Sequence, residues 1–148
     1  HYPAQIESPK PGQLRAGAHT DFDVLTIISR DDAPGGLQIM STSGTWADVP
    51  WIPKTFVVNV GDLLARWSND RWKSTLHRVV NTPRQLAQNS RRLTIGYFQQ
   101  VNTRTLIEAL PGTTSDHNPA KYSPITAGEH HNEKFLRQAN AASRLALD

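Results

Sequence analysis

The sequence predicts a mainly β fold, a sandwich or a barrel, followed by one helix near the C-terminal end. Seven or eight short apolar, β-branched runs recur along the chain, with turn-forming residues about every ten positions. The 148 residues, 37% of them hydrophobic and 20% charged, are enough for one domain with a core of its own.

The expected elements follow one another as strands. Residues 1–13 contain three prolines and should form an extended or looping segment. Ser43-Gly44 predicts a hairpin turn between two of the strands. Apolar and β-branched composition predicts strands over 24–29, 36–40, 45–49, 55–60, 63–67, 75–80 and 92–101.

The final segment has a different pattern. Thr126 and Glu129 have the spacing of a capping box, and apolar residues then recur at roughly helical spacing. We therefore expect an amphipathic helix over 128–143. The chain should divide into a β core over 1–127 and a helical region over 128–148 packed on it, although a helix that binds a partner would show the same pattern.

Composition excludes several classes of function. The formal net charge is +3, and the basic side chains are scattered, so no nucleic-acid-binding surface is expected. No apolar run approaches the roughly 18 residues that a membrane span needs, and no secretory signal is visible. The absence of cysteine excludes disulfides and thiolate zinc sites. We expect a cytoplasmic protein without a membrane or nucleic-acid partner.

Three side chains form a candidate metal site. His19 and Asp21 are two residues apart and can reach one ion from the end of a strand, and His77 would come from another strand. Two imidazoles and one carboxylate are the ligands of non-heme Fe(II) oxygenases. A zinc hydrolase can use the same ligands, so these residues alone leave the reaction open.

The other histidines are weaker candidates. His117 lies in a turn-like stretch. His130 and His131 are neighbours on the expected helix, where adjacent side chains point about 100° apart and cannot easily share an ion.

A candidate anion site follows the second histidine segment. If 92–101 is a strand, Arg92 and Thr94 face the same side, while Leu93 and Ile95 face the other side into packing. A guanidinium beside a hydroxyl would hold a carboxylate. The alternative is that Arg92 extends along the surface into solvent.

Together these segments resemble the C-terminal catalytic region of the isopenicillin N synthase-like iron oxygenases, most of which depend on 2-oxoglutarate. The order and spacing of the segments also fit that family, and the resemblance extends from Tyr2 to about residue 143. The matching segments are 19–23, 25–26, 35–38, 58–62, 68–74, 77–79 and 92–94.

The resemblance implies a double-stranded β-helix, or jelly roll, with His19, Asp21 and His77 as Fe(II) ligands and catalytic residues. It implies a dioxygenase that uses O2 and 2-oxoglutarate to hydroxylate, desaturate or cyclise a small molecule, with release of succinate and CO2. Two alternatives stay open: an iron oxidase of the same family that does not use 2-oxoglutarate, and a non-catalytic jelly-roll binding module.

The resemblance also assigns the cosubstrate contacts. Arg92 and Thr94 would bind the distal carboxylate of 2-oxoglutarate, with Thr94 standing where family members usually have Ser. Tyr2 precedes Pro3, as does a Tyr in the family's Asn-x-Tyr motif, and is a second candidate contact. Because such enzymes have an N-terminal region that helps to cover the barrel, we expect this sequence to be a fragment. Its own N-terminal region would be a partner, without which it could be inactive.

Overall fold

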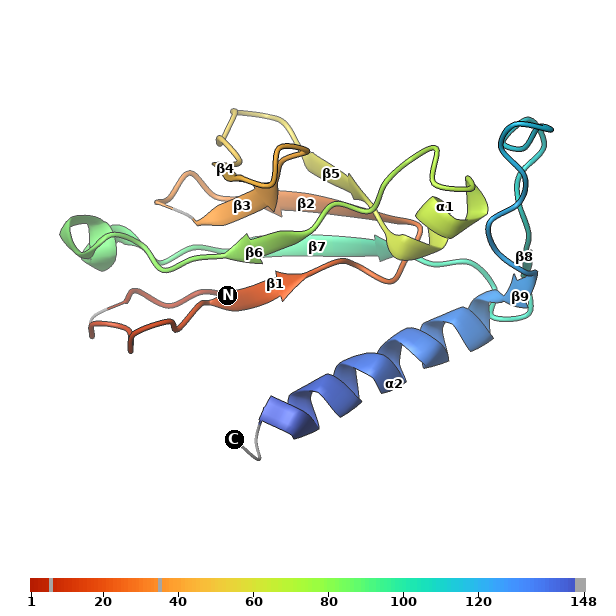
Figure 1. Ribbon diagram of the computed structural model, residues 1–148. Helices are drawn as coiled ribbons and strands as arrows, with labels where there is room; N and C mark the ends of the chain where they lie inside the picture. The colour runs from red at the N-terminus through yellow and green to blue at the C-terminus, as the bar shows by residue number, and fades with distance from the viewer. Residues whose placement is uncertain (6, 35, 146–148) are drawn as a thin grey trace. The chain divides into compact units, whose positions relative to one another are not determined.

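The computed structural model describes residues 1–5, 7–34 and 36–145, with side chains up to residue 140. Gly35 of the 35–38 segment and the last three residues of the expected 128–148 region lie outside the described residues. The chain is mainly β with one long C-terminal helix (Figure 1), so the predicted fold class is confirmed.

Short strands dominate the chain up to residue 107. The elements are β1 (Ala16–His19), β2 (Leu25–Arg30), β3 (Leu37–Met40), β4 (Trp46–Asp48), β5 (Val57–Val60), α1 (Asp62–Trp67), β6 (His77–Val79), the 3-10 helix η1 (Arg84–Asn89), β7 (Thr94–Gln99), β8 (Leu106–Ile107), β9 (Ile125–Thr126) and α2 (Ala127–Leu145).

The chain forms two compact units. The first comprises 1–20, 26–59 and 75–97, and the second comprises 21–25, 60–74 and the chain from 98 onward. The expected division at residue 127 stays a prediction.

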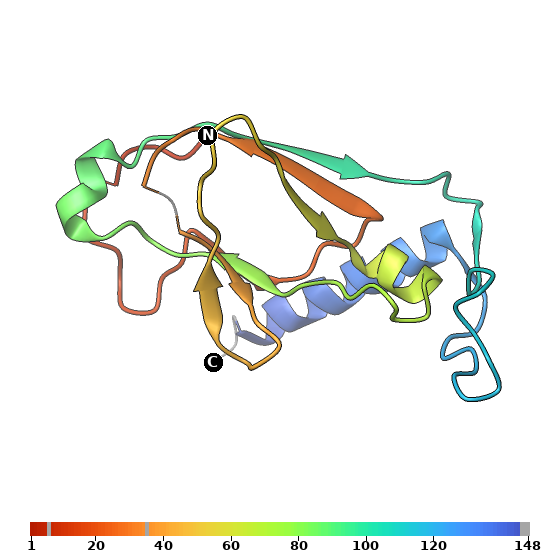
Figure 2. The ribbon, with the colours of Figure 1, turned by 90° about the horizontal axis from the view of Figure 1, so that it is seen from above.

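The first unit is built on two sheets, seen as two layers in Figure 2. One sheet has the strand order β1-β6-β3-β4, and the other has the order β5-β2-β7. β6 pairs antiparallel with both β1 and β3. β3 and β4 form the expected hairpin, in which Gly44 takes the left-handed conformation with φ 79°. The pairing of β6 with β1 thus places His77 beside His19.

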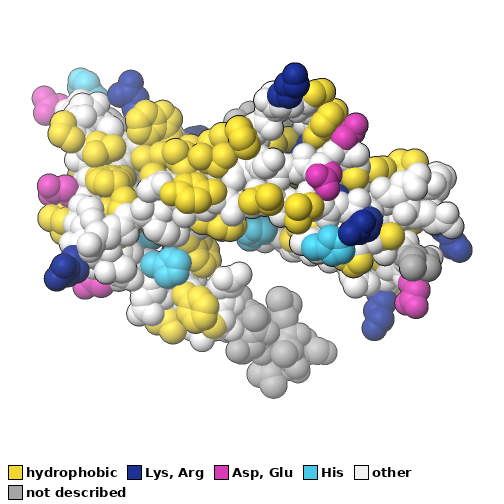
Figure 3. Space-filling view, turned by 180° about the vertical axis from the view of Figure 1, so that it is seen from behind, with side chains coloured by type: hydrophobic (Ala, Val, Ile, Leu, Met, Phe, Trp, Pro, Cys, Tyr) yellow, Lys and Arg dark blue, Asp and Glu magenta, His cyan; other side chains and the backbone are white. Residues whose placement is uncertain are grey.

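One face of the β5-β2-β7 sheet is exposed and apolar. Leu93 and Ile95 are 48% and 61% exposed, so the prediction that they point into packing was wrong for this chain. Their alternation with the more buried Arg92 and Thr94 is as predicted, but nothing among the described residues covers the outer side. Figure 3 shows the hydrophobic band, which comprises Phe56, Val58, Leu93, Ile95 and Tyr97.

The predicted strand over 63–67 is wrong, because this segment is helix α1. Its sequence, Asp-Leu-Leu-Ala-Arg-Trp, contains strong helix formers and no β-branched residue. Asp62 in the first turn and Arg66 in the last also complement the helix dipole. An apolar run of this length does not by itself distinguish a strand from a helix.

The second unit has its own small core. Leu63, Ile107 and Ala127 are buried together, one from each of α1, β8 and α2. β8 and β9 pair antiparallel. At two residues each, these strands are too short to give a periodic signal, which explains why the sequence did not predict them.

The predicted start of the final helix is confirmed. The backbone N–H of Glu129 donates to the Thr126 hydroxyl at 3.2 Å, and the Thr126 N–H donates to the Glu129 carboxylate at 2.9 Å. This reciprocal capping box satisfies two N–H groups that the helix itself leaves unpaired. No helix within the described part of the chain is long and apolar enough to cross a membrane.

Candidate metal centre

The two strand histidines lie opposite each other across the β1–β6 pair. The register shifts between Ala16, which pairs with Val79, and His19, which pairs with His77. Such a bulge redirects a side chain at a strand end. The two imidazole rings lie 4.3 Å apart between centroids at an interplanar angle of 55°. Two residues far apart in the sequence are therefore neighbours in space.

Each of these rings is oriented by a backbone carbonyl. The Nδ1 of His19 lies 2.7 Å from the Gly17 oxygen, and the Nδ1 of His77 lies 3.0 Å from the Thr75 oxygen. A carbonyl oxygen only accepts, so both Nδ1 atoms carry the hydrogen in the neutral ring. The lone pair is thereby left on Nε2, which is the arrangement expected of a metal-ligating histidine.

Asp21 completes the cluster. One potential ligand atom from each of His19, Asp21 and His77 lies within 4.8 Å of the others, and Asp21 is only 9% exposed. Two neutral imidazole nitrogens and one carboxylate oxygen fit ferrous iron and leave coordination positions open. The structure therefore brings together the three residues selected from the sequence, which could bind iron.

The backbone around Asp21 is held by the start of α1. The N–H of Asp62 donates to the Asp21 carbonyl at 2.8 Å, and the N–H of Leu63 donates to the Asp23 carbonyl at 3.1 Å. These are N–H groups of the first helical turn, which lack partners within the helix. The helix end therefore holds the segment that carries the carboxylate ligand.

Gly61 makes this close approach possible. A Cβ at this position would lie closer than 3.0 Å to the Asp23 carbonyl oxygen and side chain. Sequence reasoning did not assign a role to Gly61 or to the Asp62 amide. The matching segment 58–62 contained both, but only the folded backbone shows what they contact.

Arg92 is buried beside Tyr2. It is 4% exposed, its Nη1 donates to the Pro34 carbonyl at 3.3 Å, and its guanidinium lies 4.3 Å from the centre of the Tyr2 ring. Backbone hydrogen bonds in both directions also join Tyr2 and Arg92. The alternative of an Arg92 extending along the surface is therefore wrong.

The charges around Arg92 favour an anion. Burial lowers the pKa of its guanidinium, and the positive charges of Arg15 and Arg30 lower it further, while Tyr2 raises it. Several guanidinium groups near one buried position attract a carboxylate. Thr94 begins β7 and is half-buried.

The remaining histidines lie elsewhere. His117 is exposed in a loop. His130 is buried in the second unit, and His131 packs edge-on against Phe22 at 6.1 Å. Among the described residues, the only cluster of three potential ligands is that of His19, Asp21 and His77.

The group of three potential metal ligands, the buried Arg92 and the antiparallel sheets together are typical of an iron oxygenase. The chain belongs to the 2OG-Fe(II) oxygenase superfamily, whose family model matches residues 1–101. Its fold is the jelly roll of this family, with a C-terminal helix.

Curated relatives are enzymes of this kind. Homoarginine-6-hydroxylase 2-ODD-C23 of Glycine max is 39% identical over 125 residues, which cover 83% of this chain and 36% of the relative. The 2-oxoglutarate-Fe(II) type oxidoreductase hxnY of Emericella nidulans is 36% identical over 127 residues, covering 85% of this chain and 35% of the relative. The chain thus spans just over a third of the length of these relatives.

Solved structures are also similar to this chain. A full-length Neurospora crassa protein, crystallised in complex with alpha-KG, superposes with a TM-score of 0.78 at 46% identity, covering 84% of this chain and 41% of that one. In the complex of the same protein with alpha-KG and thymine, the TM-score is 0.80 at 44% identity, with coverage of 87% and 39%.

Proposed function

We propose that the full-length protein is an Fe(II)- and 2-oxoglutarate-dependent dioxygenase that oxidises a small molecule by hydroxylation, desaturation or ring closure, with release of succinate and CO2. The observation that carries the proposal is the cluster of His19, Asp21 and His77, in which one potential ligand atom from each residue lies within 4.8 Å of the others. The lack of cysteine fits our further proposal that the protein acts in the cytoplasm.

In this proposal the protein provides position and charge. His19, Asp21 and His77 hold the metal on one side and leave the opposite side open. Bound iron supplies the redox chemistry that activates O2. Gly17 and Thr75 hold the imidazole rings in place through their carbonyls, and the Asp62 amide holds the backbone of Asp21.

We assign Arg92 and Thr94 to the distal carboxylate of 2-oxoglutarate. The burial of Arg92 and the nearby charges of Arg15 and Arg30 support this assignment. Tyr2 would contribute by keeping the guanidinium in position, because its ring lies against it.

We also propose that a further part of the full-length protein covers the hydrophobic band of the β5-β2-β7 sheet. The band is larger than the scattered apolar residues usual on a folded surface. The relatives are more than twice as long as the matched segment, and a covering region of this kind would also help to shape the substrate pocket.

The test is an anaerobic titration of the full-length protein with Fe(II) and then 2-oxoglutarate, monitored by visible absorption, followed by assay of succinate release on exposure to O2. The substrate panel should include thymine and homoarginine, which the names of the similar proteins suggest. Substrate-stimulated succinate is the expected result. Product formed without 2-oxoglutarate would indicate the non-2-oxoglutarate oxidase, and no metal-dependent O2 uptake would indicate a binding module.

A further inference from the structure

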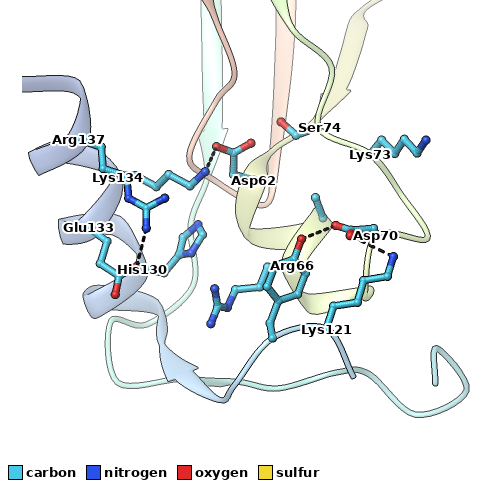
Figure 4. Close-up of a pocket in the computed structure, with 12 residues that line it drawn as sticks. Asp62, Arg66, Asp70, Lys73, Ser74, Lys121, His130, Glu133, Lys134 and Arg137 are labelled. Carbon is cyan, nitrogen blue, oxygen red and sulfur yellow. Dashed lines mark hydrogen bonds and ion pairs between the residues drawn. The ribbon is translucent and has the colours of Figure 1, made fainter. Parts of the chain in front are cut away.

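The second unit contains a cavity of about 580 Å³ that plays no part in the proposed iron chemistry. Its walls come from α1, from the following loop up to Ser74, from residues 121–122 and from α2 (Figure 4). Charged side chains dominate the walls. Five of them are basic and three acidic, namely Arg66, Lys73, Lys121, Lys134, Arg137, Asp62, Asp70 and Glu133.

We propose that this cavity binds a small oxyanion of the phosphate class. The proposal rests on the charges and on the buried polar atoms of the cavity, and it stands independently of the function proposed for the iron site.

The acidic side chains of the cavity are already neutralised by basic neighbours. Each lies in an ion pair with a lysine or arginine of the same cavity. The pairs are Asp62 with Lys134 at 2.8 Å, Asp70 with Lys121 at 3.1 Å, and Glu133 with Arg137 at 4.0 Å. Two basic side chains, Arg66 and Lys73, form no ion pair with any carboxylate in the described part of the chain, so the cavity has an excess of positive charge.

Arg66 presents a donor that needs an acceptor. Its Nη2 donates to the Ser123 carbonyl at 2.7 Å, and its guanidinium lies over the Tyr122 ring at 4.9 Å. These contacts fix the side chain at the wall of the cavity, yet its buried Nε–H has no hydrogen-bond partner among the described residues. An N–H donor can be satisfied only by an acceptor, and an anionic oxygen is the strongest acceptor available.

His130 provides the second, independent sign of a ligand. Its side chain is 4% exposed, and its ring extends from α2 into the cavity (Figure 4). Within the described ranges its Nε2 has no hydrogen-bond partner, and the same is true of the buried hydroxyl of Ser74 on the opposite wall. A buried polar atom without a partner is costly, so three such atoms around one cavity favour a polar ligand that bonds to all of them.

The surroundings of His130 also fit an anion. Its pKa is lowered to about 4, chiefly by burial and also by the charges of Lys134 and Arg66, against smaller opposing effects of Asp62 and Glu133. An oxyanion bound at Nε2 would offset the two cations and favour the protonated ring. Bound phosphate should therefore raise the pKa of His130 above about 4.

The experiment is a calorimetric titration of the full-length protein with inorganic phosphate, at constant ionic strength and with chloride as the competing anion. Wild-type protein should bind phosphate saturably. Lys73→Gln, which breaks no ion pair found in the described part of the chain, and Arg66→Gln should each weaken binding by about fivefold or more. Arg104→Gln is the matched control, because Arg104 is exposed and lies outside the cavity.

Two further variants separate this site from the iron centre. Arg92→Gln and His77→Ala should keep wild-type affinity for phosphate if the ion binds in the cavity. Loss of phosphate binding in either variant, with retention in Lys73→Gln and Arg66→Gln, would place the ion at the iron site and overturn the inference. The absence of saturable binding to wild-type protein would also overturn it.

Discussion

At the scale of single residues, the candidate metal ligands are oriented by hydrogen bonds to the backbone. His19 and His77 were selected from the sequence as ligands, but their ring orientation comes from the carbonyls of Gly17 and Thr75. Groups of this kind tune a metal site without touching the metal. Replacing a residue of the site should therefore change activity, whereas replacing a similar residue outside it should not.

Replacing His77 should remove iron binding and turnover. The His77→Ala change removes one of the three candidate ligands, and we expect the thermal unfolding temperature of the metal-free protein to change little. Iron content and succinate release are the measurements. His117→Ala, an exposed histidine away from the cluster, is the control and should retain both. Normal iron content in His77→Ala would contradict the ligand assignment.

Arg92→Ala should mainly raise the concentration of 2-oxoglutarate required. Loss of a charge-assisted hydrogen bond costs about 1.5–3 kcal/mol, which corresponds to a KM increase of about tenfold or more. Steady-state kinetics with 2-oxoglutarate as the varied component measures it. The neighbouring Arg91 is exposed, so Arg91→Ala should leave this KM unchanged, and an equal effect of the two changes would argue against the assignment.

At the scale of elements, α1 connects the fold to the metal cluster. Its first-turn N–H groups hold the backbone that carries Asp21, and the preceding Gly61 is packed too tightly for a side chain. The strand that the sequence led us to expect over 63–67 would not direct successive backbone N–H groups at the Asp21–Asp23 segment.

A methyl group at Gly61 should therefore disturb both stability and iron binding. Gly61→Ala forces the Asp23 backbone to move, and overpacking of this kind costs about 1–3 kcal/mol. Chemical denaturation and iron titration measure the two effects. Gly17→Ala is the comparison, since a Cβ there meets nothing within 4 Å; similar behaviour of the two variants would show that the close approach at Gly61 is unimportant.

The capping box at the start of α2 should contribute measurably to stability. Thr126→Ala should cost about 1 kcal/mol in the free energy of unfolding, and Thr126→Ser should restore most of it. The hydrogen bonds from Thr126 lower the pKa of Glu129. Their stabilisation is present above the unfolded-state pKa and is lost as the pH falls through the folded-state pKa. Urea denaturation at about pH 7 and about pH 3 should show a smaller effect of Thr126→Ala at the lower pH.

At the scale of the whole molecule, two features concern the full-length protein rather than one site. The first is the exposed hydrophobic band on the β5-β2-β7 sheet. The second feature is His130, a buried histidine inside a positively charged cavity. The burial of His130 makes the stability of the protein depend on pH.

His130 should make the protein less stable as the pH falls from about 6.5 to about 4. Its pKa is lowered to about 4 in the folded protein, whereas an unfolded histidine titrates near 6.5. Between these values the unfolded chain binds more protons, so acid favours unfolding, by up to about 3 kcal/mol. Denaturation from about pH 4 to about pH 7 in phosphate-free buffer, with His130→Gln as the variant that lacks this contribution, measures the effect. Identical pH profiles would contradict the assignment.

Much of the fold, and the residues of the candidate site, could be predicted from the amino-acid sequence. Apolar and β-branched runs predicted β2, β3, β4, β5, β6 and β7 to within a few residues, and the capping box located α2. These features are local, since they depend on residues near one another in sequence. The two-residue strands and the helical character of 62–67 were not predicted, because such short segments show too little hydrophobic periodicity.

The sequence by itself determined the family and the three candidate metal ligands, because the motifs that contain them are short stretches of neighbouring residues. Only the tertiary structure decided how these residues meet. The bulge that sets His19 opposite His77, the tight fit of Gly61 against Asp23, and the polar atoms that converge from α1, Ser74 and α2 all join residues distant in sequence. Such contacts form only when distant parts of the chain come together in the folded protein, so no local sequence pattern predicts them.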